Sequence, residues 1–302
     1  MNTEQAHSLH LGKDAVPQWR DPRTAQRAVP TIWLNLVCLD APIVAVLWLC
    51  LFARTFHLPV LPGNAVALFL TAWLIYLADR LADASVLKAE LPRSLRQAFC
   101  LRHREIWISA LLLIGGFDLY VIWRSVAAGT FFAGAVVGIL ALIYLALNHP
   151  RGLIWRSLPI KEVAIGLLFT AGTLVALLPV PAPSGGAFIA CGLVFACLCS
   201  LNCISIASWE RELDRAQGKI SVATCHPRFV RHARKVGASL AFISLVMASI
   251  YRPAAPIFGC VAASALLLAL LDTLAKPGVD QRTAMADLVL LTPIIPLIAM
   301  AL

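Results

Sequence analysis

The sequence predicts an all-α, polytopic membrane protein, and three observations support this fold class. Of the 302 residues, 60% are hydrophobic and only 14% are charged, whereas a soluble domain carries roughly a quarter charged residues. The mean hydropathy is +0.82. Apolar runs of about 20 residues, the length that a helix needs to cross a bilayer, recur along the chain. The alternating pattern of a membrane β-barrel is missing from these runs.

Nine apolar segments are predicted to span the membrane as helices. They lie at about 31–53, 63–80, 105–123, 127–147, 160–180, 187–208, 236–251, 254–272 and 285–302. Short polar or proline-bearing stretches separate them. Residues 1–30 are polar and broken by Pro17, Pro22 and Pro30, so we expect a cytoplasmic N-terminal tail followed by one transmembrane domain at 31–302.

The basic residues predict the orientation of the chain. With nine spans, 22 of the 25 Lys and Arg residues fall in the N-terminal tail or after an even-numbered span. Basic residues stay in the cytoplasm during insertion. We therefore expect a multi-pass protein of the cytoplasmic membrane with its N-terminus inside. The net charge of +9 then reflects topology and contact with anionic lipids, and no nucleic-acid partner is expected.

Two segments on the predicted cytoplasmic side begin with similar acidic patterns. The first runs from Asp79 to Asp83 and the second from Glu210 to Asp214, each after an even-numbered span. On a helix, residues four apart share a face, so each acid pair projects together. Mg²⁺ is commonly held by one or two carboxylates plus phosphate oxygens. The four acids predict a metal site at the cytoplasmic end, although solvated helix ends paired with neighbouring arginines are an alternative.

Three stretches carry a resemblance to a known family. They read "DRLAD" at 79–83, "LPIKEVAIGLLFTAGT" at 158–173 and "WERELDRAQGKISVAT" at 209–224. With Tyr144, they resemble the UbiA superfamily of intramembrane prenyltransferases, which has nine transmembrane helices and motifs written NDxxDxxxD and DxxDxxxD. The chain departs from both motifs at their leading positions, which are occupied by Ile75, Tyr76 and Ala207.

The resemblance implies a membrane-embedded prenyltransferase. Such an enzyme moves an isoprenyl group from a Mg²⁺-bound isoprenyl diphosphate to a lipophilic acceptor, among membrane lipids. The implied metal ligands are Asp79, Asp83, Glu210 and Asp214. The implied catalytic residues are Lys161, Tyr144, Arg80 and Asn202. The residues expected to contact the diphosphate are Arg93, Arg102, His103 and Arg211.

Several of these residues have simpler interpretations. Arg102 and His103 suit a clamp over a phosphate group, but also an anchor at the lipid headgroups. Asn202 suits a substrate contact, but also a hydrogen bond between helices. Tyr144 suits a ring stacked on a carbocation, but also an interfacial aromatic residue.

Two other functions remain open. An intramolecular attack would make the protein a terpene cyclase. A non-catalytic lipid-binding or transport protein could also use paired acids near the centre of a repeat. Carriers more often place such acids in the middle of the membrane, at broken helices, whereas the four acids here lie at predicted cytoplasmic ends.

Isolated acids also occur within the predicted spans. Asp40 in the first span would cost about 2.5–3.5 kcal/mol at the centre of a bilayer, and Asn35 lies on nearly the same face. We expect either a functional role or a polar clamp between helices. Asp118 is expected to pair or to extend to the interface near Arg124. Asp287 is expected to cap the ninth span at its N-terminus.

Small residues are assigned to packing. The nine cysteines lie mostly within apolar segments and are expected to be apolar fillers. Close helix packing is predicted at Gly115, Gly116, Gly134, Gly138 and Gly166.

Overall fold

The chain forms a bundle of α-helices. The computed structural model describes residues 30–148, 161–178, 185–274 and 278–300, among which no β-strand occurs. The predicted all-α class is therefore confirmed, whereas the predicted tail lies outside the described residues except for Pro30. The long helices are α2 (Asp40–Thr55), α3 (Pro62–Ser85), α5 (Arg104–Ser125), α6 (Ala128–Asn148), α8 (Lys161–Val175), α9 (Gly186–Trp209), α13 (Ala233–Ile250) and α14 (Ala255–Leu271).

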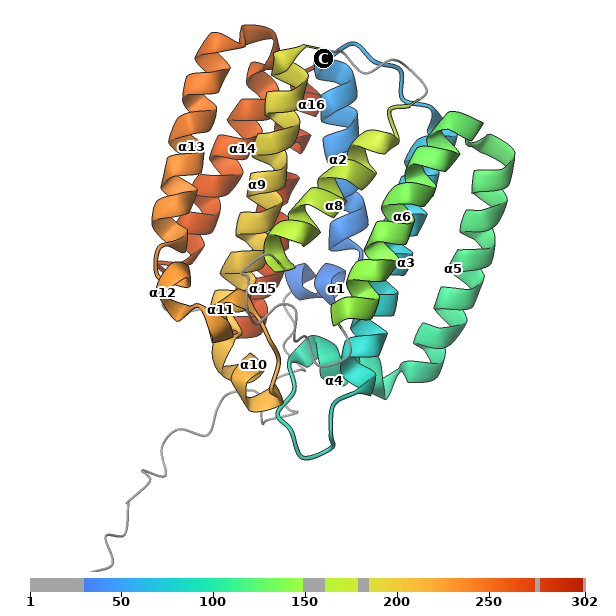
Figure 1. Cartoon of the computed structure of the whole chain (residues 1–302), viewed down its shortest axis with the longest axis vertical. Coiled ribbons are helices and arrows are strands. Elements are labelled where there is room, and N and C mark those ends of the chain that lie inside the picture. Colours follow the sequence, from blue (N-terminus) through green and yellow to red (C-terminus); the bar gives the residue numbers. More distant parts are fainter. Residues whose placement is uncertain (1–29, 149–160, 179–184, 275–277, 301–302) are drawn as a thin grey trace, which may run out of the picture.

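Short helices complete the fold at both ends of the long ones. They are α1 (Pro30–Leu36), α4 (Leu95–Arg102), α10 (Arg211–Gln217), α11 (Val222–Cys225), α12 (Pro227–Val230), η3 (Arg252–Ala254), α15 (Val279–Leu288), η4 (Val289–Leu291) and α16 (Ile294–Ala299). Figure 1 shows α5 at one edge of the bundle and α13 at the opposite edge. Helices α4, α10, α11 and α12 gather at the lower end in that view, which we call the α10 end.

Seven helical segments of the described residues are long and apolar enough to cross a membrane. They are 62–85, 104–125, 128–147, 186–209, 233–250, 252–271 and 279–299, so the chain is a multi-pass integral membrane protein. The predicted count of nine is not reached. The remaining two predicted spans hold α2 and α8, which have 16 and 15 residues and also run along the bundle (Figure 1).

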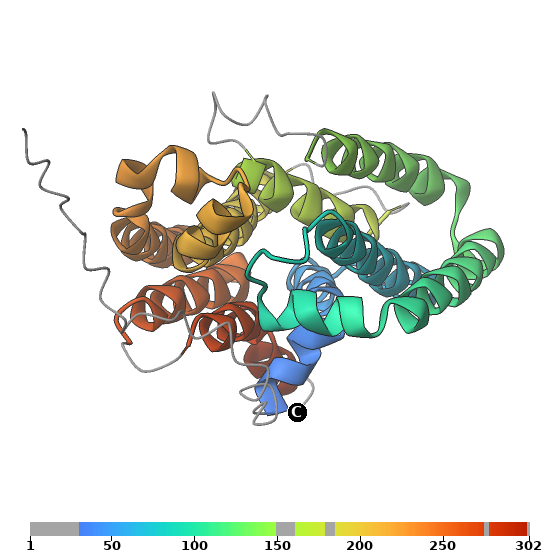
Figure 2. The same ribbon diagram turned by 90° about the horizontal axis from the view of Figure 1, so that it is seen from below.

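Apolar side chains cover the outer surface of the bundle. On α5, the side chains of Leu112, Leu113 and Trp123 are 73%, 75% and 84% exposed. Phe132 of α6 and Phe242 of α13 are exposed as well. Figure 2 shows α5 and α6 on the outside of the bundle. Water would disfavour so extended an apolar surface, whereas lipid tails are themselves apolar, so these faces are suited to lipid.

The core lies around α2, α9 and α14. Trp48 of α2 and Phe195 of α9 are fully buried and stack with ring centroids 4.2 Å apart. The indole nitrogen of Trp48 donates a hydrogen bond of 2.9 Å to the backbone oxygen of Leu290 in η4. A carbonyl at an irregular turn deep in the bundle is thereby satisfied, as an apolar environment requires.

The first predicted span is not one continuous helix. It is broken between α1 and α2, and α1 lies across the bundle axis (Figure 1). Cys38 has φ = 57°, the left-handed conformation that usually selects glycine. The backbone N–H of Cys38 donates to Asn35 O at 3.3 Å, and that of Leu39 donates to Leu34 O at 2.9 Å. This pair of bonds is the Schellman motif, which ends α1 without a glycine.

The last predicted span is also interrupted. It begins at Val279 rather than at residue 285, and η4 separates α15 from α16. Pro293, which has no N–H, directly precedes α16 and removes one helical bond. Asp287 consequently lies in the last turn of α15. The prediction that Asp287 caps the start of this span is therefore wrong.

Only one of the predicted packing glycines lies at a close helix contact. A Cβ added to Gly166 of α8 would lie 2.2 Å from Ser200 Oγ and 2.6 Å from the backbone oxygen of Ala196, both on α9. The two backbones therefore approach each other closely at this point. An added Cβ would meet nothing closer than 3.8 Å at Gly115, Gly116, Gly134 and Gly138.

Candidate functional site

The first acid pair lies in the last two turns of α3, at the α10 end. The Oδ2 atom of Asp83 accepts a hydrogen bond of 2.6 Å from the Nζ atom of Lys219. The side chains of Asp83 and Lys219 are 32% and 23% exposed. Since Lys219 belongs to the tail of the second acidic segment, this ion pair joins the two segments. The alternative interpretation, in which the acids pair with neighbouring arginines, does not describe Asp83, because its partner lies 136 residues away in the sequence.

A glycine directs Lys219 toward α3. Gly218 caps the C-terminus of α10 with φ = 68°, a conformation that glycine adopts without steric cost. The backbone N–H of Lys219 donates to Asp214 O at 2.8 Å, and that of Gly218 donates to Arg215 O at 3.1 Å. The chain therefore reverses at the end of α10, and Lys219 leaves the turn beside α3.

A second lysine lies against the same acids. Lys161, the first residue of α8, donates from Nζ to the backbone oxygen of Ile220 at 3.4 Å. Both lysines lie close enough to the nearby carboxylates to stabilise their negative charge. We call these five residues the acid–lysine cluster: Asp79, Asp83, Asp214, Lys161 and Lys219.

Asp214 is poised to titrate near neutral pH. Burial raises the pKa of this carboxyl to about 6, and the negative charge of Glu210 acts in the same direction. A hydrogen bond to Ser221 and the charges of Lys219 and Lys161 oppose the increase in pKa. Burial has the largest of these effects on the pKa of Asp214. A positive charge added nearby would favour the ionised form of this carboxyl.

Glu210 is held apart from this cluster. It lies at the junction of α9 and α10. Its Oε2 atom accepts a hydrogen bond of 2.5 Å from Arg96 of α4, and its Oε1 atom accepts one of 3.2 Å from Thr283 of α15. Both carboxylate oxygens of Glu210 therefore bind side chains of other helices. Of the four predicted acids, three belong to the acid–lysine cluster, and Glu210 does not.

Hydrogen bonds of side-chain amides connect the start of α4 to the end of α10. Gln217 donates to the backbone oxygen of Pro92 at 2.7 Å and to Oε1 of Gln97 at 2.9 Å. Ser94 and Gln97 form a capping box at the start of α4, which fixes the first turn of this helix. The basic segment after α3 therefore lies over the α10 end.

Two more of the predicted catalytic residues lie near the acids. Arg80 is close enough to Asp40, Asp79 and Glu210 to interact with all three charges. It therefore links the cluster to Glu210. Tyr144 of α6 lies near Asp79.

The residues expected to contact a diphosphate lie on the segments around α4 and α10. Arg93 donates to the backbone oxygen of Lys88 at 3.3 Å. Arg102 is exposed at the end of α4, and the ring of His103 packs against Phe99 with centroids 4.7 Å apart. Neither the Arg93 nor the His103 contact involves an acid of the cluster. Arg211 is half-buried in the first turn of α10.

A cavity opens deeper in the bundle, next to the cluster. Tyr76, one turn before Asp79 on α3, and Cys203, two turns before Glu210 on α9, belong to its wall. The full lining is Ala41, Val44, Tyr76, Ile165, Phe169, Cys199, Asn202, Cys203, Asp287 and Leu290. Apolar and aromatic side chains dominate this wall, as in small-molecule sites generally.

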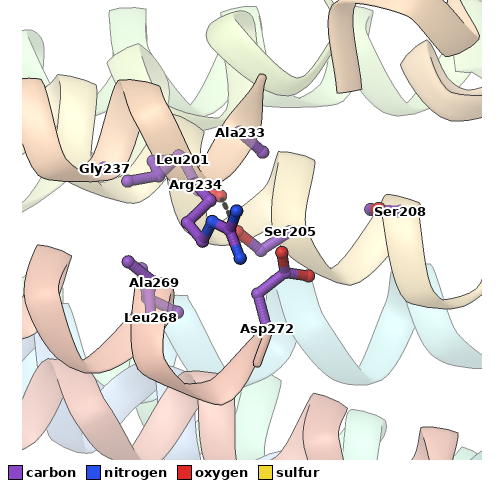
Figure 3. A pocket seen from close by; sticks show the side chains of 9 residues that line it. All are labelled: Leu201, Ser205, Ser208, Ala233, Arg234, Gly237, Leu268, Ala269 and Asp272. Atoms are coloured by element: carbon purple, nitrogen blue, oxygen red, sulfur yellow. Dashed lines mark hydrogen bonds between the residues drawn. The ribbon is translucent and has the colours of Figure 1, made fainter. Parts of the chain in front are cut away.

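A second, smaller pocket lies elsewhere, between α9, α13 and α14 (Figure 3). Arg234 and Asp272 point toward one another across it. Asp272 also accepts a hydrogen bond of 3.0 Å from the indole nitrogen of Trp209, and Ser205 donates to the backbone oxygen of Leu201 at 2.9 Å. Because the polar groups already have these partners, we regard this pocket as a packing gap between helices.

The cluster suits a metal ion that arrives with its own ligands. Within the described part of the chain, no three His, Cys, Asp or Glu side chains come together as a metal-binding group. Asp79, Asp83 and Asp214 offer the oxygen ligands that Mg²⁺ prefers, and Mg²⁺ is usually held by one or two carboxylates plus phosphate and water. Glu210 does not fit this role because Arg96 and Thr283 bind both its oxygens.

Comparisons with known proteins identify no relative. No family model, curated protein or solved structure matches the chain. The site residues therefore have to be interpreted from their own chemistry.

Proposed function

We propose that this protein is a membrane-embedded prenyltransferase, which moves an isoprenyl group from a Mg²⁺-bound isoprenyl diphosphate to a lipophilic acceptor. The observation that carries the proposal is the ion pair between Asp83 and Lys219. This ion pair joins the two acidic segments. Lys219 and Lys161 both lie near the carboxylates of the acid–lysine cluster, which is next to an apolar cavity. A diphosphate needs cations around its oxygens, and an isoprenyl chain needs an apolar chamber.

In the proposed reaction, the bond between the allylic carbon and the diphosphate oxygen breaks. The electron pair leaves with the diphosphate, and Lys161 and Lys219 stabilise the charge that develops on it. Mg²⁺, held by Asp79 and Asp83, would neutralise further charge on the diphosphate oxygens. The allylic cation is then attacked by the acceptor, which loses a proton. The ring of Tyr144 lies near Asp79 and can face the cation.

The cavity contributes by excluding water. Its wall includes Val44, Ile165, Phe169 and Leu290, apolar side chains that would face an isoprenyl chain entering from the acid–lysine cluster. An allylic cation reacts rapidly with water, so a chamber of this kind favours transfer to the acceptor. An intramolecular attack in the same chamber would give a terpene cyclase instead.

The topology that we propose follows from the basic residues. Arg93, Arg96 and Arg102 lie on the segment after α3, five Lys and Arg residues lie between α9 and α13, and two more, Arg234 and Lys235, lie in the first turn of α13. Both segments belong to the α10 end (Figure 1). By the distribution of Lys and Arg, this end faces the cytoplasm, with nine spans when α2 and α8 are included and with the N-terminus inside.

A second candidate function is a lipid-binding or transport protein. It is favoured by the breaks between α1 and α2 and between α15 and α16, because carriers use interrupted helices at their binding sites. Asp40 and Asp287 lie next to these breaks. Such a protein would bind a lipophilic ligand without releasing diphosphate.

An assay of diphosphate release separates these candidates. The purified chain in lipid nanodiscs is mixed with radiolabelled geranylgeranyl diphosphate and a lipophilic phenol, with Mg²⁺ or with a chelator. We expect diphosphate release that requires Mg²⁺ and falls at least tenfold in Asp83→Asn. Asp118→Asn, which removes a buried acid bonded to Thr71 instead, is the matched control. No release in any condition, with prenyl diphosphates of three chain lengths, would reject the enzyme.

A further inference from the structure

Two carboxyl groups meet inside the bundle, away from the acid–lysine cluster. The amide nitrogen of Asn35 donates to Asp40 Oδ2 at 2.7 Å and to Asp287 Oδ2 at 2.9 Å. The carboxyl groups of Asp40 and Asp287 also lie within hydrogen-bonding reach of each other. Two carboxylates at such a distance repel each other unless a positive charge or a proton lies between them.

The positions of the two acids at helix ends make them unequal. Asp40 is the first residue of α2, directly after the break at Cys38, and its Oδ1 atom accepts a hydrogen bond of 2.9 Å from the backbone N–H of Ala41. Asp287 lies in the last turn of α15, directly before η4. A helix dipole stabilises a negative charge at the N-terminus and disfavours one at the C-terminus. Asp40 is therefore suited to the ionised form and Asp287 to the protonated form.

The positive charges nearby do not balance two carboxylates. The charged or titratable side chains that face the pair from the surrounding segments are Cys38, Tyr76, Arg80, Arg96 and Cys203. Thiols and phenols are ordinarily neutral at pH 7. Arg80 also interacts with Asp79, and Arg96 forms an ion pair with Glu210. Because both cations are shared with other acids, one proton between the two carboxyl groups relieves the repulsion that remains.

Asn202 of α9 connects the pair to the cavity. Its amide nitrogen donates to Asp287 Oδ1 at 2.9 Å, while its Oδ1 atom is buried without a hydrogen bond. The residue is 5% exposed and lines the cavity, to which α8 contributes the apolar side chains of Ile165 and Phe169. The cavity has room for about one water molecule. Such a water can donate a hydrogen bond to Asn202 Oδ1 beside Asp287.

We propose that Asp40 and Asp287 form a proton-binding site inside the bundle, in which the carboxyl group of Asp287 holds one proton and donates it in a hydrogen bond to the carboxylate of Asp40. A water molecule on Asn202 Oδ1 exchanges this proton, delivering one to Asp287 as another leaves. The site takes a proton rather than a metal ion, because the amide nitrogens of Asn35 and Asn202 already donate to its oxygens and would repel a cation. It stands whether or not the acid–lysine cluster binds a diphosphate, and so it goes beyond the proposed function.

Infrared spectroscopy of the full chain in nanodiscs tests this inference. Aspartate labelled with ¹³C at its side-chain carboxyl identifies the C=O band of protonated Asp residues. We expect Asp287→Asn to remove the intensity of one protonated carboxyl group at about pH 7. Unchanged intensity of this band in Asp287→Asn would overturn the inference.

A titration of the same band tests the role of Asp40. In Asp40→Asn the proton loses the carboxylate that accepts its hydrogen bond. We therefore expect Asp287 to bind it at least tenfold less tightly, with a midpoint lower by about one pH unit or more. Asp272→Asn, which removes an exposed acid directly after α14, is the matched control and should leave the midpoint unchanged. An unchanged midpoint in Asp40→Asn would show that the proton is not shared, and this comparison with wild type holds even if Asp287→Asn fails to fold.

Filling the cavity tests the path of exchange. Ile165→Phe leaves all four polar residues in place, and we expect the protonated carboxyl band to persist while its exchange in D₂O slows at least tenfold. Leu167→Phe adds the same ring at an exposed position of α8 and should exchange at the wild-type rate. Equal rates in the two variants would contradict a path through the cavity. Asn202→Leu, which removes the acceptor for the water, takes the place of Ile165→Phe if that variant does not fold.

Discussion

Lys219 donates a hydrogen bond of 2.6 Å to Asp83 across 136 residues of sequence. Asp83 lies in α3, and Lys219 lies in the turn after α10. Their ion pair brings the two acidic segments into one cluster. Because both side chains are less than one-third exposed, solvent screens the pair less than it screens a surface ion pair.

The first prediction concerns the strength of this pair. A double-mutant cycle of Lys219→Met and Asp83→Asn should give a coupling free energy of about 1 kcal/mol, measured by SDS unfolding in mixed micelles. The exposed pair Arg215–Glu212, 2.9 Å apart, is the control and should give about 0.3 kcal/mol. Equal couplings for the two pairs would mean that Lys219 and Asp83 interact no more strongly than an exposed ion pair, which would contradict the prediction.

The second prediction separates a structural acid from a ligand. Glu210→Gln removes the charged partner of Arg96 in a part-buried pair, and losing a hydrogen bond between charged groups costs about 1.5–3 kcal/mol. We expect lower stability in SDS unfolding but an unchanged Mg²⁺ dependence of diphosphate binding under conditions where the variant is folded. Glu212→Gln, an exposed acid on the same short helix, should change neither. Loss of the Mg²⁺ dependence in Glu210→Gln would instead return Glu210 to the metal site.

The third prediction concerns pH. The pKa of Asp214 is raised to about 6 in the folded protein, above about 3.9 in an unfolded chain. The folded state therefore holds this proton more tightly, and its contribution to stability is lost as the pH rises from 4 through 6. Asp214→Asn should flatten this part of the stability profile and be more stable than wild type at pH 8. Unfolding curves between pH 4 and pH 8 measure this, and an unchanged slope would contradict the burial of Asp214.

The fourth prediction tests the contact between α8 and α9. Gly166→Ala places a methyl group 2.2 Å from Ser200 Oγ and close to backbone atoms of α9, so the helices must separate. Overpacking of this kind costs about 1–3 kcal/mol. Gly138→Ala, where an added Cβ meets nothing within 4 Å, should leave the unfolding midpoint unchanged or slightly raised. Similar behaviour of the two variants would show that α8 and α9 are not closely packed at Gly166.

Much of the fold could be predicted because lipid-facing helices need long apolar runs. Seven predicted spans are helices of sufficient length, and the exposure of Leu112 and Leu113 agrees with that assignment. The break after Leu36 could not be predicted, because a glycine usually marks a Schellman motif in the sequence. Here Cys38 adopts the left-handed conformation instead.

The acids of the site could be located from their spacing, but their partners could not. In the sequence, Lys219 is one of several basic residues whose presence the predicted membrane topology already explains. The turn at Gly218 shows why its side chain reaches Asp83. In the sequence, Glu210 and Asp79 occupy equivalent places in two similar acidic patterns. Glu210 binds Arg96 and Thr283 instead, because α4 and α15, which sequence spacing does not relate to α9, pack at this end.

We propose above that the acid–lysine cluster binds a Mg²⁺-bound isoprenyl diphosphate. The most direct measurement is the equilibrium dissociation constant of radiolabelled geranylgeranyl diphosphate for wild type and Lys219→Met, each with Mg²⁺ and with a chelator. We expect Mg²⁺-dependent binding to wild type that is about 10- to 100-fold weaker in Lys219→Met, the effect of losing one charge-assisted hydrogen bond. Affinity that is the same in both proteins, or that does not respond to Mg²⁺, would contradict the account.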